Sequence, residues 1–208
     1  MIAWAIVGFT RRGGGDPFTL ASATALYARV LLIVGVVMAL TGAGTILKAG
    51  FGFVHIAYSY YAPQVGPAYT SPDSNVAILQ FDFPDQQRSQ DLVLGITLLV
   101  IGALVAVGHY YLARAVAHMA GGSPGWVTRG AVLALTVVTA IAGISSAAIG
   151  LNQMLSYFII GPPQSQEPWG ESVGMAIAFV PAWIYAMTRL VRDLRRPTVA
   201  ATPIQGSA

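Results

Sequence analysis

The chain has 208 residues, of which 55% are hydrophobic and only 9% are charged, and its formal net charge is +3. A soluble domain usually carries about 25% charged residues, so this composition excludes an ordinary soluble protein and predicts an integral membrane protein. The small net charge also excludes an electrostatic nucleic-acid-binding surface, and the absence of cysteine excludes disulfides, thiolate metal sites and cysteine nucleophiles.

Residues 1–19 are predicted to form a separate segment at the cytoplasmic face or at the membrane interface. Met1–Phe9 is apolar but too short to span a bilayer. Arg11 and Arg12 follow this run, whereas the basic residues of a signal peptide precede its apolar part. We therefore expect an interfacial or partner-bound segment.

The body of the chain, residues 20–196, contains four long apolar runs. A helix rises about 1.5 Å per residue, so about 20 apolar residues cross a hydrocarbon core of about 30 Å. The prediction is an all-α, polytopic membrane protein in which four transmembrane helices, near residues 28–52, 91–115, 129–158 and 171–193, form one bundle. The runs that lack Asp, Glu, Lys and Arg are Val30–Leu47, Leu92–Ala113, Gly130–Ile160 and Ser172–Thr188.

Arginine is unevenly distributed between the two sides of these spans. The side that holds both termini carries most of the arginines, and the acidic residues gather in the loops of the opposite side. By the positive-inside rule, we expect both termini in the cytoplasm of a bacterium, with the protein in its inner membrane. The arginines of the inner side are Arg11, Arg12, Arg29, Arg114, Arg129, Arg189, Arg192, Arg195 and Arg196.

The outer loop, residues 53–90, is long and rich in aromatic side chains. It holds Tyr60, Tyr61, Phe81 and Phe83, and Trp169 lies in the second outer loop. These aromatics are typical of an interfacial belt, but they also suit a surface that docks a protein or a pigment. Both interpretations stay open at this point. Residues 197–208 are predicted to form a flexible tail.

Small residues recur every four positions within the spans. In lipid, helices associate by close backbone contact through such residues, so we expect them at the interhelical surfaces. The predicted packing residues are Gly35, Ala39, Ala43, Gly102, Ala106, Gly143, Ala147, Gly174, Ala178 and Ala182.

Two helical hairpins show signs of an internal repeat. Spans one and three both begin at an arginine, and spans two and four both end in aromatics followed by arginine. The second helix of each hairpin carries part of the pattern Gly-x-Pro-x-Trp-x-x-His-Trp followed by Arg: Gly102, His109 and Tyr110 fit the first copy, and Pro181 and Trp183 fit the second. Over residues 25–195 the chain resembles bacterial membrane proteins of domain-of-unknown-function family 5671, which implies a four-helix architecture and no known activity.

The three histidines provide the few candidate cofactor ligands. The topology puts His55 near the outer face and His109 near the inner one, so they cannot ligate one haem within a subunit. A single axial ligand, His109, is compatible with a pigment or haem held against a partner chain. No metal site, phosphate-binding loop or nucleophile motif is present, and the sequence requires no cofactor.

The leading hypothesis is a non-catalytic membrane subunit that stabilises a larger complex, photosynthetic or respiratory, with lipid and other membrane subunits as partners. It is not expected to be an enzyme, because the four runs carry no Asp, Glu, Lys or Arg and the chain offers no pair of cofactor ligands. Two alternatives are a small carrier or channel for a neutral or apolar solute and a protein that binds a pigment or quinone.

Overall fold

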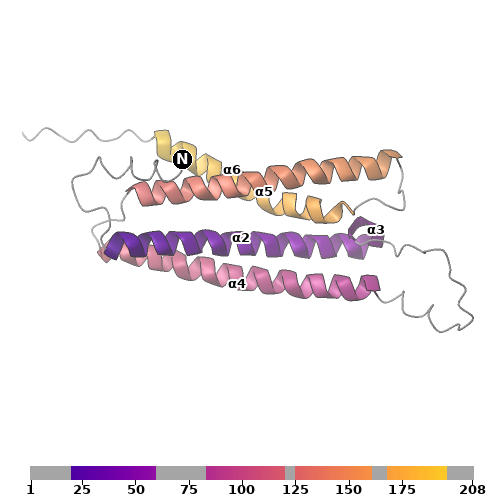
Figure 1. Ribbon diagram of the computed structural model, residues 1–208, viewed down its shortest axis with the longest axis horizontal. Coiled ribbons are helices and arrows are strands. Elements are labelled where there is room, and N and C mark those ends of the chain that lie inside the picture. Colours follow the sequence, from indigo (N-terminus) through magenta and orange to yellow (C-terminus); the bar gives the residue numbers. More distant parts are fainter. Residues whose placement is uncertain (1–19, 60–82, 120–124, 161–167, 196–208) are drawn as a thin grey trace, which may run out of the picture.

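The computed structural model describes residues 20–59, 83–119, 125–160 and 168–195, and the helix labels follow Figure 1. The predicted loop aromatics Tyr60, Tyr61 and Phe81 lie outside these residues, as do residues 1–19 and the tail. Four of the helices are long and apolar enough to cross a membrane, which confirms the all-α, four-helix membrane fold. The helices are α2 (Leu20–Val54), α3 (Ile56–Ser59), α4 (Phe83–Met119), α5 (Gly125–Ile160) and α6 (Gly170–Arg195).

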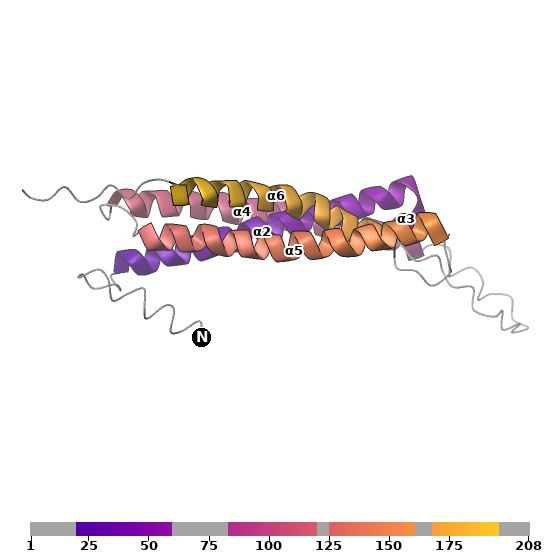
Figure 2. The same cartoon turned by 90° about the horizontal axis from the view of Figure 1, so that it is seen from above.

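The four long helices run alternately up and down along one common direction (Figures 1 and 2). Helix α2 lies at the centre, because it contacts α4, α6 and α5, whereas α5 also packs against α6. Among the described residues, α4 packs along α2 and makes hardly any contact with α5 or α6. One side of α4 therefore belongs to the bundle, and the rest of its surface faces outward.

Helix α4 begins at Phe83, well inside the predicted outer loop 53–90. Its polar first turns contain an ion pair one turn apart, in which Arg88 Nη2 lies 2.7 Å from Asp85 Oδ1. The Arg88 guanidinium also stacks over the ring of Phe53, 4.1 Å from its centroid. Pairs at this spacing stabilise helices, and the contact with α2 adds a cation–π attraction. These contacts account for helical structure where the composition alone suggested a loop.

Glycine allows α2 and α4 to approach very closely. A Cβ added at Gly35 would lie 2.5 Å from the backbone nitrogen of Ala106, and one added at Gly95 would lie 3.0 Å from the carbonyl oxygen of Gly42. Gly102 lies equally close to the backbone of Ala39. Because these contacts are with backbone atoms, no side-chain rotation could relieve them. The helices are thus held by dispersion contacts between bare backbones, the main attraction available in lipid.

The other contacts of the bundle use glycine in the same way. Gly174 of α6 lies against α2, where an added Cβ would be 2.7 Å from the carbonyl oxygen of Gly44. On α5, Gly143 lies against the backbone of Phe179 and Val180 of α6. Each helix therefore contributes at least one glycine to its interhelical contact.

Charged residues mark two levels of the bundle. Three helices carry one charged residue at each end of the apolar run, and α5 carries Arg129 at its beginning. The separations match a hydrocarbon core of about 30 Å, which fits helices that cross the membrane. At about 1.5 Å per residue, they are about 28 Å for Arg29 and Lys48, about 34 Å for Asp91 and Arg114, and about 27 Å for Glu171 and Arg189. We refer below to the arginine-rich end (Arg29, Arg114, Arg129 and Arg189) and the ion-cluster end (Lys48, Asp91 and Glu171).

Candidate functional site

Three helices are joined by one lysine at the ion-cluster end. Lys48 Nζ lies 3.0 Å from Asp91 Oδ2 of α4 and 3.1 Å from Glu171 Oε2 of α6. The side chains of Lys48 and Asp91 are 14% and 18% exposed, whereas that of Glu171 is 58% exposed. The Lys48–Asp91 pair is thus largely shielded from solvent, and the two pairs of Lys48 together hold the ends of α2, α4 and α6 at a common level.

The predicted site residues did not include this cluster, although the sequence carries a signal for it. Lys48 follows the first charge-free run directly, and Asp91 and Glu171 directly precede the second and fourth runs. The predicted topology puts all three residues on the same side of the membrane, so an ion pair between them could have been predicted. Which charges meet depends on how each helix is rotated about its own axis, and one sequence does not give that rotation.

Helix α3 folds back over the end of α2. The hydroxyl of Ser59 donates a hydrogen bond of 2.6 Å to the carbonyl oxygen of Lys48. Gly170, the first residue of α6, lies against Ser59 and the carbonyl oxygen of Tyr58, so a larger residue would collide with this turn. The short helix is thereby bonded to the backbone of Lys48 and contacts the beginning of α6.

Trp169 is the centre of an aromatic cluster at the same end. Its ring lies 4.9 Å from that of Tyr58 and 5.1 Å from that of Phe51, and Phe158 of α5 is 6.4 Å away. Trp169 is only 7% exposed, so it is held inside the protein between α2, α3 and α5. The tryptophan predicted to mark the interface therefore lies at the end of the bundle, with its ring packed against protein. Phe83, from the same predicted set, is the first residue of α4.

His109 lies on α4 toward the arginine-rich end. Its Nδ1 is 2.8 Å from the carbonyl oxygen of Val105, and its ring meets that of Tyr27 edge-on at 5.8 Å. The hydrogen bond to its own helix orients the ring and leaves Nε2 as the nitrogen that would ligate a metal. In the part of the chain that the structure describes, no group of three or more His, Cys, Asp or Glu side chains suits a metal ion.

Six of the predicted small residues lie at contacts between helices. Gly35, Ala39, Gly102 and Ala106 meet at the α2–α4 contact, Gly174 meets α2, and Gly143 meets α6. Ala43, Ala147, Ala178 and Ala182 are half-buried, as Ala39 and Ala106 are. On either side of Ala43, Gly42 lies against α4, and Gly44 lies against α6.

The outward face of α4 differs from these contacts. We define it as Thr97, Ile101, Leu104, Gly108 and Tyr111, which lie three or four residues apart and opposite the side that packs on α2. Leu104 and Tyr111 are 69% and 63% exposed. A Cβ added at Gly108 would meet nothing within 4 Å. Gly50, Gly125 and Gly130 have similar space, but each lies within six residues of a helix end.

No family model, curated protein or solved structure matches this chain. The resemblance to domain-of-unknown-function family 5671 and the internal repeat therefore stay predictions. The function is therefore inferred from the structure of the chain itself, above all from its ion-cluster end, its arginine-rich end and the outward face of α4.

Proposed function

We propose that this chain is a non-catalytic membrane subunit that packs against a larger membrane complex through the outward face of α4. Gly108 carries the proposal. A glycine in a helix interior costs about 1 kcal/mol relative to alanine, and the glycines at the contacts of α2, α4, α5 and α6 offset this by close packing. Gly108 has no such neighbour among the described residues. A helix from another protein would supply one.

The position of α4 supports the same proposal. Because α4 is held by α2 on one side only, a long apolar surface remains for a further helix. Lipid covers apolar surfaces equally well, but lipid does not require a glycine beneath it. The combination of a glycine with large exposed neighbours, Leu104 and Tyr111, provides a hollow flanked by side chains. Knobs of a partner helix fit such hollows.

The setting belongs to the proposal as well. We place the protein in a bacterial inner membrane with its arginine-rich end in the cytoplasm, by the positive-inside rule. An energy-transducing complex, photosynthetic or respiratory, is the proposed context. A carrier that works as a single chain is less well supported, because Ser145 and Asn152, two polar residues of the third predicted span that could line a path, are exposed on the outside of α5.

Co-purification tests the proposal. Wild-type protein, Gly108→Leu and Ala103→Leu would each be extracted from native membranes in mild detergent. Ala103 is also exposed on α4 but lies off the outward face, so it provides the matched control. We expect Gly108→Leu to lose the co-migrating membrane proteins that wild type and Ala103→Leu retain. A wild-type protein that purifies as a stable monomer without other proteins would contradict the proposal.

A further inference from the structure

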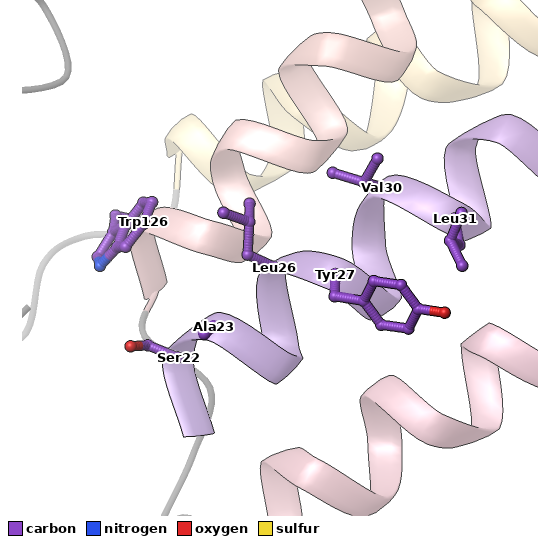
Figure 3. Close-up of a pocket in the computed structure, with 7 residues that line it drawn as sticks. All are labelled: Ser22, Ala23, Leu26, Tyr27, Val30, Leu31 and Trp126. Atoms are coloured by element: carbon purple, nitrogen blue, oxygen red, sulfur yellow. The ribbon is translucent and has the colours of Figure 1, made fainter. Parts of the chain in front are cut away.

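An apolar groove of about 320 Å³ lies between α2 and α5 at the arginine-rich end of the bundle (Figure 3). Helix α2 forms one wall, and Trp126 of α5 forms the other. The lining residues of α2 are Ser22, Ala23, Leu26, Tyr27, Val30 and Leu31. Figure 3 shows Leu26 and Trp126 on the two helices, with Val30 further along α2. The lining is apolar almost throughout, so the groove suits an apolar occupant.

Most of this groove lies outside the hydrocarbon core of the membrane. Arg29 and Arg129 mark the boundary of the core on α2 and α5. Leu26 and Trp126 each precede the arginine of their helix by about 4.5 Å, at the rise of about 1.5 Å per residue. Both side chains are 42% exposed. Tryptophan is common at this level of a membrane, but an exposed leucine is not typical of an aromatic belt. Because acyl chains lie on the other side of the arginines, we expect a protein segment to cover this surface.

The chain itself carries an apolar segment on the same side of the membrane. Met1–Phe9 has no polar or charged side chain, and residues 10–19 connect it to Leu20, the first residue of α2. Residues 1–19 lie outside the part of the chain that the structure describes. The groove runs about 14 Å along α2 from Ser22 to Leu31, and Met1–Phe9 measures about 14 Å as a helix or about 30 Å when extended. The segment is therefore long enough to cover the groove in either conformation.

We propose that Met1–Phe9 packs into this groove of its own chain and covers Leu26 and Trp126. Residues 13–17 (Gly-Gly-Gly-Asp-Pro) are of the types that form turns, so the connection allows the segment to run back along α2. Residues 10–19 reach about 33 Å when extended, which exceeds the length of the groove.

The covalent connection distinguishes this occupant from others. A second copy or another protein would have to bind the groove from solution, whereas Met1–Phe9 is held beside it at a high effective concentration. The groove is lined by α2 and α5 alone, so the inference does not depend on the outward face of α4 or on its proposed partner.

Photo-crosslinking within the full-length protein tests this placement. A crosslinking residue in place of Leu26 should form an adduct with residues 1–9, identified from its peptides by mass spectrometry, while the protein keeps the mass of a single chain. Leu194, which is 71% exposed and lies beyond Arg189 at the same end of α6, is the matched control and should give no such adduct. An adduct of Leu26 with lipid, with another protein or with a second copy would overturn the proposal, and so would equal adducts at the two positions.

A single cysteine in the groove provides a quantitative readout, because the chain has no cysteine of its own. In the full-length protein, Ile6→Asp should raise the rate at which a maleimide labels Ala23→Cys about tenfold or more, since the segment loses an apolar contact and would have to bury a charge. Thr10→Asp adds the same charge just outside the apolar segment and should leave the rate unchanged. An unchanged rate in Ile6→Asp, or an equal rise in Thr10→Asp, would contradict the proposal.

Discussion

Lys48 Nζ lies 3.0 Å from Asp91 Oδ2, and this pair joins the central helix α2 to α4. Among the described helices, α4 packs extensively against α2 alone. The exposed Glu171 makes the second bond of Lys48. Since the Lys48–Asp91 pair is the more shielded of the two, we expect it to contribute more to stability. The ion cluster and the glycine contacts thus hold α4 on α2 from the edge of the membrane inward.

Lys48→Met should destabilise the protein by about 1–3 kcal/mol, because it removes the positive charge that pairs with the mostly buried Asp91 carboxylate. Asp91→Asn should cost a similar amount, and Glu171→Gln should cost less than about 1 kcal/mol since Glu171 is mostly exposed. Thermal unfolding followed by circular dichroism in one detergent would measure the series. A double-mutant cycle should give a larger coupling for Lys48 with Asp91 than with Glu171, and the reverse order would refute this account of the cluster.

Gly102→Ala should separate α2 from α4. The added methyl group collides with the backbone of Ala39, which cannot rotate away, so we expect a loss of about 1–3 kcal/mol. Gly108→Ala is the matched control, because it lies on the same helix with open space around it. In the purified chain it should be neutral or stabilising by up to about 1 kcal/mol. Equal losses for the two variants in an unfolding assay would show that close packing at Gly102 is not the cause.

Trp169→Ala should loosen the cap formed by α3. The loss of a buried tryptophan costs about 3–5 kcal/mol in a protein core, and this ring touches those of Phe51 and Tyr58. Trp169→Phe should cost much less, because the indole N–H makes no hydrogen bond with the described residues. Hydrogen exchange of the Ser59 region would detect the change. Unaltered protection in Trp169→Ala would mean that the cap does not depend on the ring.

Single cysteines can test the orientation cleanly, because the chain has none of its own. Gln87→Cys places a thiol on an exposed residue beyond the ion-cluster end, and Leu194→Cys places one on an exposed residue at the arginine-rich end. The positive-inside rule predicts that an impermeant maleimide labels the first and spares the second in intact cells. Labelling of Leu194→Cys alone would show that the chain has the opposite orientation in the membrane.

The sequence predicted the four spans because charge-free runs of the required length occur mainly in membrane-spanning helices. It predicted Gly35, Ala39, Gly102 and Ala106 as packing residues, but not which helix each of them contacts. Gly35 and Gly42, and likewise Gly95 and Gly102, lie seven residues apart, a spacing that keeps one face together where helices cross at a small angle. A four-residue stripe through Ala43 drifts away from that face. The rotation of each helix about its axis could therefore be determined only from the structure.

The same limit applies to the candidate sites. Arg29 and Arg129 were recognised as the beginnings of two spans, but nothing in the sequence shows that Trp126 closes a pocket beside Leu26. Trp169 was predicted for the second outer loop, and it directly precedes α6 at the ion-cluster end. The burial of the Trp169 ring depends on α3 folding back over α2. The four residues of α3 carry no sequence pattern that predicts this tertiary contact.

Site-specific photo-crosslinking in native membranes tests the central claim most directly. A crosslinking residue at Leu104 lies on the outward face of α4, and one at Ile149, which is 51% exposed on α5, provides the matched control. We predict that Leu104 yields an adduct with another membrane protein and that Ile149 yields lipid adducts only. Lipid adducts alone at both positions would contradict a subunit that assembles through α4.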